Sequence, residues 1–200
     1  MLLSNKSRIE DILSFMNVSL NTPIQIHGIR FILGNNPIRE HPTFEDYSNT
    51  LIRNRKATAK VDYGEKTIEV VSGSDGIFRV HCGHFNSRQP HEFVDHNEDG
   101  PAVLTFDDHI GDEQYLLKYV KYCINGEKYR FGAPASIAYK HGVVVSEVHY
   151  QNDVLHNSIG PAYRFRHNVN SDWQNEFYID GRRISINRFF ELYKKRMSLG

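Results

Sequence analysis

The chain has no long apolar run, no net charge and very little cysteine, and each of these shortages excludes a class of protein. It contains no uninterrupted apolar stretch of the roughly 18 residues that a membrane-spanning helix needs. Lysine plus arginine equals aspartate plus glutamate at 24 each, so no overall field attracts nucleic acid or an anionic membrane. The two cysteines, Cys82 and Cys123, are too few for a disulfide framework and favour reduced thiols.

A secretory leader is not recognisable, because charged residues between Lys6 and Asp11 interrupt any apolar segment near the N-terminus. We therefore expect a cytoplasmic protein. Aromatic residues are plentiful, with 11 tyrosines and 12 phenylalanines, which suits half-buried strands. A length of 200 residues is enough for one folded core.

A short phrase occurs three times in the C-terminal half. The copy at 96–102 reads His-Asn-Glu-Asp-Gly-Pro-Ala, and the copy at 156–162 reads His-Asn-Ser-Ile-Gly-Pro-Ala. A degenerate copy at 129–135 reads Tyr-Arg-Phe-Gly-Ala-Pro-Ala. A repeated phrase indicates a repeated supersecondary unit, so this half is predicted to be a β-repeat array.

Each copy is followed by the same order of elements: a short strand, a turn, a longer aromatic strand and a tight turn. The tight turns are Asn125-Gly126, Asn152-Asp153 and Asp180-Gly181, which favour type I′ hairpins because both central residues take positive φ. The predicted strands of this half are 102–106, 115–124, 135–139, 143–150, 162–166 and 173–179.

The remaining segments predict a helix at each end and a small sheet before the repeats. Ser7 and Glu10 have capping-box spacing, which indicates a short amphipathic helix over 7–17. At the other end, 185–198 carries the apolar stripe of a helix that we expect to close the open end of the array. Between the first helix and the repeats we predict strands at 24–33, 59–63, 66–71 and 77–82, a loop at 35–56 and a polar link at 83–95.

Taken together, these patterns predict a mainly β (α+β) fold: an antiparallel β-meander of hairpin repeats with N-terminal and C-terminal helices. The expected division is 1–90 for the first helix and small sheet, 91–184 for the three-unit array, and 185–200 for the capping helix, all in one continuous domain.

The pattern His-x-x-Asp-Gly-Pro-Ala, followed by a strand and then by aromatic-x-Ile-Asn-Gly-Glu-Lys, resembles the MORN-repeat-variant proteins of phages, large viruses and bacteria. The best copy joins 96–102 to 122–128, and the resemblance covers about residues 91–184. The middle copy lacks the His and the Asp, and the last has Ile159 where the first has Asp99. The resemblance implies a β-meander ribbon used for protein or membrane association, in some cases as one member of a toxin–antitoxin pair.

The same resemblance implies a source in a phage or a bacterial mobile element. Within that setting we expect a protein that acts in the host cytoplasm, where it binds and inhibits or regulates a host factor, for example a component of host immunity.

One cluster has the residue types of a zinc site: His81, Cys82 and His84, with His91 and His96 nearby. Residues 81 and 82 face opposite sides of a strand, so they cannot both bind one ion without a bulge. We favour hydrogen-bonded or surface histidines and expect no bound metal or other cofactor, with a metal site as the alternative. A reactive thiol at Cys82, beside these imidazoles, is a further alternative.

Two other kinds of chemistry remain as alternatives. A metal-dependent nuclease would hold Mg²⁺ through Asp107 or Asp108 and use His96 or His109 as its base. Nucleic-acid binding would use basic residues, although a solvated basic face explains them as well. These residues are Arg53, Arg55, Lys56, Lys60, Arg182, Arg183, Arg188, Lys194, Lys195 and Arg196.

The function that we favour is non-catalytic recognition of another protein, through one face of the sheet and the 35–56 loop. Large aromatic residues and arginine dominate the energetics of protein interfaces. The expected partner-binding residues are Arg53, Arg55, Lys56, Tyr119, Tyr122, Tyr150, Trp173 and Tyr178. A structural or assembly protein that forms a homo-oligomer through open sheet edges, or an antitoxin-like partner, is the alternative.

Overall fold

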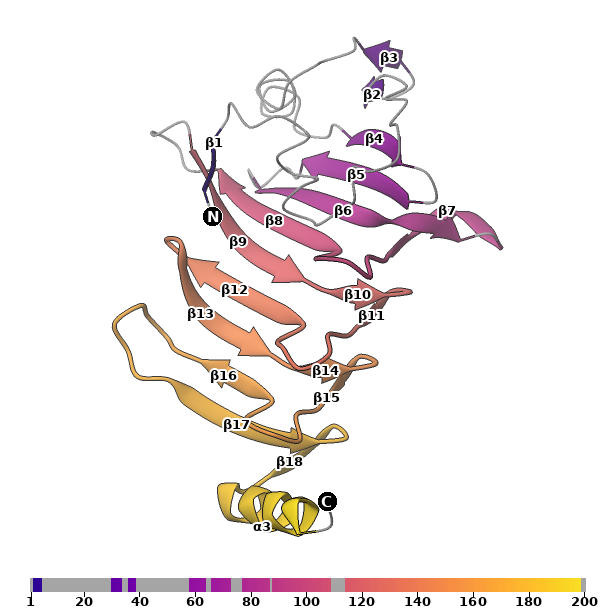
Figure 1. The fold of residues 1–200 in the computed structure, drawn as a ribbon. Coiled ribbons are helices and arrows are strands. Elements are labelled where there is room, and N and C mark those ends of the chain that lie inside the picture. Colours follow the sequence, from indigo (N-terminus) through magenta and orange to yellow (C-terminus); the bar gives the residue numbers. More distant parts are fainter. Residues whose placement is uncertain are drawn as a thin grey trace.

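The computed structural model describes residues 2–4, 30–33, 36–38, 58–63, 66–72, 77–86, 88–108 and 114–198. Within these residues one antiparallel sheet of 14 strands forms a long twisted ribbon, and the helix α3 (Ile186–Met197) lies at its end (Figure 1). The prediction of a mainly β, meander-like antiparallel fold with a C-terminal helix is confirmed. The assignment of the repeats to a family stays a prediction.

Neighbouring strands in the sheet are mostly neighbours in the chain, as in a meander. The path through the sheet is β18 (Arg182–Ile184), β17 (Gln174–Ile179), β16 (Tyr163–Phe165), β13 (Val143–Val148), β12 (Ser136–Lys140), β9 (Gln114–Lys121), β8 (Val103–Asp108), β6 (Ile77–Asn86), β5 (Lys66–Ser72), β4 (Thr58–Tyr63), β2 (Arg30–Leu33) and β3 (Asn36–Ile38). Two strands lie off this path: β1 (Leu2–Ser4) pairs with β9, and β7 (Gln89–Asp95) pairs with β6.

Each long strand of the array bends and continues into a short hairpin. β9 leads into β10 (Cys123–Ile124) and β11 (Glu127–Lys128), β13 leads into β14 (Tyr150–Gln151) and β15 (Val154–Leu155), and β17 pairs directly with β18. The turn residues have φ of 50° and 86° in the first hairpin, 50° and 61° in the second, and 49° and 76° in the third. Positive φ at both positions confirms the type I′ turns that the residue types predicted.

These hairpins are joined to one another in a regular stack. The backbone N–H of the second turn residue donates to a carbonyl of the preceding hairpin at every step. The bonds run from Gly126 to Asp95 (2.8 Å), from Asp153 to Lys128 (3.2 Å) and from Gly181 to Leu155 (2.9 Å). The array therefore has two columns, one of long strands and one of short hairpins.

The repeated phrase is explained by the loop that joins one hairpin to the next strand. The Asn97 side-chain amide donates to the Pro101 carbonyl at 3.0 Å, and Asn157 makes the same bond to Pro161 at 3.0 Å. In the degenerate copy Arg130 replaces the asparagine, and its guanidinium reaches the Pro134 carbonyl at 3.4 Å. Each of these side chains thus closes its own loop, a role that the sequence analysis did not assign to them.

The histidine of the phrase joins this loop to the next turn. His96 Nδ1 accepts a hydrogen bond from the Asn125 N–H at 3.0 Å, and His156 Nδ1 lies 3.2 Å from the Asp180 N–H. His156 Nδ1 is also 2.8 Å from the Asp180 carboxylate. The phrase is therefore a structural signature that sets the stacking of the hairpins.

The core of the array lies where the strands from β6 to β9 meet. The alanine that ends each phrase is fully buried at Ala102, Ala135 and Ala162, because it sits between two long strands. Burial raises the pKa of the Cys123 thiol to about 11, so this group stays protonated at neutral pH. The large apolar side chains of the core are Val80, Leu104, Phe106, Leu117 and Val120.

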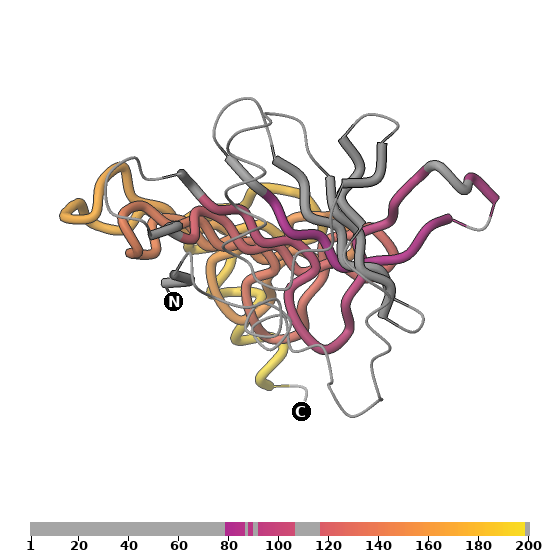
Figure 2. Tube along the Cα trace, turned by 90° about the horizontal axis from the view of Figure 1, so that it is seen from above, coloured from indigo at the N-terminus to yellow at the C-terminus, as the bar shows by residue number. Residues whose placement is uncertain are grey.

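Several predicted boundaries need correction. The link expected at 83–95 is a long hairpin, the β6–β7 arm, which projects from the ribbon (Figure 2). Within the loop expected at 35–56, Asn36–Ile38 form β3 and pair with β2. The helix expected over 7–17 lies outside the described residues, as does most of the 35–56 loop.

The C-terminal helix begins and ends close to the predicted positions. Ser185 is its N-cap, and its hydroxyl accepts from the Arg188 N–H at 3.2 Å. Phe189 anchors it to the sheet by packing on Phe177, with ring centroids 4.8 Å apart. No helix among the described residues is long and apolar enough to cross a bilayer.

Candidate interaction surface at the end of the sheet

The helix α3 carries an apolar stripe that the sheet does not cover. Ile186, Phe190, Tyr193 and Met197 follow one another at spacings of four, three and four residues, so they form one line along the helix. Their exposed fractions are 52%, 51%, 36% and 69%. The expected helix is present, but of its predicted stripe only Phe189 is buried. We call the four exposed residues the α3 stripe.

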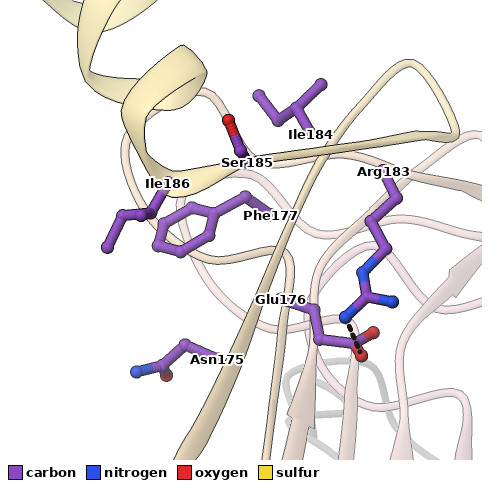
Figure 3. A pocket seen from close by; sticks show the side chains of 7 residues that line it. All are labelled: Asn175, Glu176, Phe177, Arg183, Ile184, Ser185 and Ile186. Atoms are coloured by element: carbon purple, nitrogen blue, oxygen red, sulfur yellow. Dashed lines mark ion pairs between the residues drawn. The ribbon is translucent and has the colours of Figure 1, made fainter.

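A groove of about 660 Å³ lies beside the start of the helix, between β17 and the β18–α3 junction (Figure 3). Glu176 and Arg183 face each other across part of it, with an ion pair of 3.0 Å. Phe177 and Ile186 line its apolar side. The groove and the α3 stripe share Ile186, so together they form one end surface of the ribbon. The residues that line the groove are Asn175, Glu176, Phe177, Arg183, Ile184, Ser185 and Ile186.

Positive charge lies at the C-terminal end of α3. Lys194, Lys195 and Arg196 occupy the last turn of α3, where the helix dipole stabilises cations. Among the described residues they have no ion-pair partner, whereas Arg188 pairs with Glu191 at 2.8 Å. The surface therefore suits an apolar partner with a negatively charged rim.

The five aromatic residues that the sequence singled out are all half-buried and already engaged within the chain. Arg130 stacks over the ring of Tyr122 at 3.9 Å, and Lys128 lies 4.6 Å from the ring centre of Tyr150. Such contacts favour a structural role for these rings. Tyr119 hydrogen-bonds Ser136, and Tyr178 donates to Glu176 at 3.1 Å. The guanidinium groups of Arg164 and Arg166 each lie 4.8 Å from the ring centre of Trp173.

Of these five, only Tyr178 contacts a residue of the end surface, through Glu176. Arg53, Arg55 and Lys56 lie outside the described residues. The periodicity of the sequence predicts the apolar stripe. It does not predict that the stripe is exposed, because exposure depends on which part of the helix the sheet covers.

The histidine side chains near Cys82 that the structure describes have different partners. His81 binds the Asp95 carboxylate at 2.8 Å, while Cys82 is fully buried. His84 and His96 contact each other edge to face, with ring centres 5.2 Å apart. Among the described residues, no group of three His, Cys, Asp or Glu side chains is placed to hold a metal ion. The side chains of His91, Asp107 and Asp108 lie outside the described residues, as does His109, so the nuclease alternative is not tested.

Asp95 is the centre of a largely buried ionic cluster. Its second carboxylate oxygen accepts from Lys121 Nζ at 2.8 Å. Burial opposes the charge on Asp95, but the hydrogen bonds from His81 and Lys121 outweigh it and hold the pKa of Asp95 below its usual value. Burial likewise opposes the charge on Lys121, yet the bond to Asp95 raises the pKa of Lys121 above its usual value.

The Asp95 cluster is expected to stabilise the fold in a pH-dependent way. Asp95→Asn should lower the free energy of unfolding by about 2 kcal/mol at pH 7, because it leaves Lys121 buried without its counter-charge. The folded pKa of Asp95 is depressed, so its contribution is complete above the unfolded value of 3.8 and is lost as the pH falls through the folded pKa. Urea unfolding of both proteins at pH 7 and pH 3 measures the difference.

A matched control is Asp180→Asn, which removes the carboxylate that lies 2.8 Å from His156. That carboxylate is 80% exposed, against 18% for Asp95. We expect a loss below about 1 kcal/mol, because solvent screens exposed pairs. Equal losses in the two variants would contradict the assignment of the Asp95 cluster as a stabilising feature.

No protein-family model, curated protein or solved structure matches this chain significantly.

Proposed function

We propose that the chain is a non-catalytic protein-recognition module whose end surface, the α3 stripe with its adjoining groove, contacts the partner. The observation that carries the proposal is the exposure of the α3 stripe on a helix that is otherwise capped and anchored. Contiguous exposed apolar side chains rimmed by polar residues are typical of interaction sites. The cations of the last turn favour a partner whose apolar patch has acidic neighbours.

The partner class follows from the resemblance noted in the repeats. A phage or mobile-element protein of this kind would bind a host factor and inhibit or regulate it. In that role recognition alone suffices, since covering a functional surface of the host protein requires no chemistry from the binder.

The proposal predicts that Phe190→Ser and Met197→Ser each lower partner recovery at least about tenfold, because truncation of a central apolar contact commonly costs more than 1.4 kcal/mol. The experiment is affinity capture from host lysate with tagged wild-type chain, followed by quantitative mass spectrometry. Asn187→Ser is the matched control: it lies on the same helix, is exposed and does not belong to the stripe. Thermal unfolding of all four proteins excludes loss of the fold.

Equal recovery of the same partner by Phe190→Ser and by the wild type would overturn the role of the stripe. Light scattering adds a second readout. If the wild type forms a homo-oligomer that Phe190→Ser dissociates, the stripe is a self-association surface and the proposal fails.

A further inference from the structure

The last unit of the array lacks the strand that follows every earlier hairpin. After each earlier hairpin the chain returns as a short strand beside the long strand before it: β8 lies beside β6, β12 beside β9 and β16 beside β13. After β18 the chain enters α3 instead (Figure 1). The position beside β17 that the next strand would take is therefore not filled by the unit's own sequence.

Ser185 marks the point where the chain leaves the repeat pattern. It stands four residues after the turn residue Gly181, as Asn157 stands four residues after Asp153. Asn157 closes the loop that leads into the next strand, whereas Ser185 caps a helix through its bond to the Arg188 N–H. The same position in the unit thus directs the chain away from the edge of β17.

The edge that results has backbone groups directed away from the sheet. The Glu176 carbonyl accepts from the Ala162 N–H at 3.0 Å, so the polar groups of Glu176 point toward β16. Neighbouring residues of a strand alternate in this respect, and the N–H and C=O of Asn175 therefore point to the opposite side. Within the part of the chain that the structure describes, no strand pairs with Gln174–Glu176 on that side. Asn175 and Glu176 line the groove there (Figure 3).

The earlier units show which segment fits such an edge. In each of them the N–H of the long strand's bend donates to the carbonyl of the alanine after proline, and that alanine side chain is fully buried. The three bonds run from Cys82 to Ala102 (2.7 Å), from Tyr122 to Ala135 (2.8 Å) and from His149 to Ala162 (2.7 Å). In the last unit Phe177 pairs with Ile184 instead, so the β17–β18 pairing is one pair longer than β10–β11 and β14–β15.

We propose that the edge of β17 at Gln174–Glu176 is a strand-addition site for an extended segment of a partner protein, in which Pro-Ala precedes alternating strand residues. Backbone pairing at Asn175 would supply affinity, and the side chains that alternate along the segment would supply selectivity. A second copy of the chain cannot supply such a segment from its array, because its own Ala102, Ala135 and Ala162 are buried between strands. The inference rests on the proposed function, since the α3 stripe adjoins the same groove.

The test uses a fluorescent peptide with the sequence of Gly160–Arg166, the segment that fills the equivalent position beside β13. Binding to the full chain is followed by anisotropy. In the earlier units the residue two places after the alanine pairs with the residue equivalent to Asn175, so the peptide's Arg164 N–H would meet the Asn175 carbonyl. A peptide methylated on that nitrogen should bind at least about tenfold more weakly, because it loses one donor and sterically blocks the pairing.

The protein side is tested with two substitutions at one position. Asn175→Pro removes the N–H on the open side and leaves the bonds of Glu176 to β16. It should lower the affinity for the peptide at least about tenfold. Asn175→Thr is the matched control, since it keeps both backbone groups, and should bind as the wild type does. If Asn175→Pro does not fold, the comparison of the two peptides on the wild-type chain still decides.

Two results would overturn strand addition: no binding of the unmodified peptide to the wild type, or equal binding of the methylated and unmodified peptides. Capture of the protein partner by the two variants distinguishes this inference from the proposed function. If Phe190→Ser weakens binding of the partner and Asn175→Pro does not, recognition by the end surface stands and strand addition is wrong. If neither substitution weakens binding of the partner, both proposals are wrong.

Discussion

Gly83→Ala is expected to disrupt the base of the β6–β7 arm and to destabilise the protein by about 3 kcal/mol or more. A Cβ at this position would lie 2.0 Å from the Val94 carbonyl oxygen and 2.9 Å from its carbon. Both are backbone atoms of the paired strand, so no side-chain rotation relieves the clash. Gly83 pairs with Asp95, whose carbonyl receives the first bond of the hairpin stack from Gly126, and the disturbance therefore reaches the array.

The measurement is urea unfolding followed by circular dichroism, with Gly142→Ala as the control. Gly142 has φ of +75° but has no atom within 4 Å of an added Cβ. Alanine there meets only the backbone cost of positive φ, about 1 kcal/mol. If both variants lose the same stability, the close approach of Gly83 to Val94 does not explain the need for glycine at position 83.

Phe106→Ala is expected to lower the free energy of unfolding by about 4 kcal/mol, because it removes a large buried ring and leaves a cavity. Phe106 is 1% exposed and lies in β8 opposite Leu117 of β9. Leu104, two residues earlier on the same side of β8, is fully buried as well. The ring therefore contributes to the most completely buried part of the sheet.

The matched control is Phe131→Ala, the same substitution at a ring that is 89% exposed in the loop of the degenerate repeat. Its expected cost is below about 0.5 kcal/mol. Calorimetric melting of the two variants beside the wild type gives the comparison. A cost at Phe131 as large as that at Phe106 would place the core of the array elsewhere than between β6 and β9.

Local residue chemistry predicted the parts of the fold that depend on a few neighbouring positions. Asn125-Gly126 and Asp180-Gly181 specify type I′ turns, because these residue types tolerate positive φ at low cost. The predicted range 185–198 agrees closely with α3, whose N-cap Ser185 accepts from a first-turn N–H. Both signals act within four residues and need no tertiary contact.

Features that depend on distant segments could not be predicted in this way. The polar stretch 83–95 gave no alternating pattern, and it forms a hairpin because β6 extends beyond the edge of β8. The apolar residues of α3 have the periodicity of a buried helix face, yet only Phe189 is buried, where it packs on Phe177 of the sheet. Which side of the stripe is covered depends on the direction in which the chain leaves β18, and the residue pattern of the helix does not contain that information.

The asparagines of the repeated phrase are an intermediate case. Asn97 and Asn157 recur in the sequence, but their bonds to the Pro101 and Pro161 carbonyls depend on how the loop folds back. Arg130 shows why a search for the asparagine motif misses the middle unit. Its longer side chain reaches the Pro134 carbonyl, which is equivalent to that of Pro101, so the bond persists although the residue type differs.

The stepwise bonds between successive hairpin turns also bear on how such a chain can change over generations. Each step uses the same donor and acceptor positions, so an internal duplication or deletion of one whole unit would leave every remaining junction chemically satisfied. Such an event would lengthen or shorten the ribbon, while the C-terminal helix would still pack on the last unit. The length of the ribbon could then evolve independently of the binding surface at its C-terminal end.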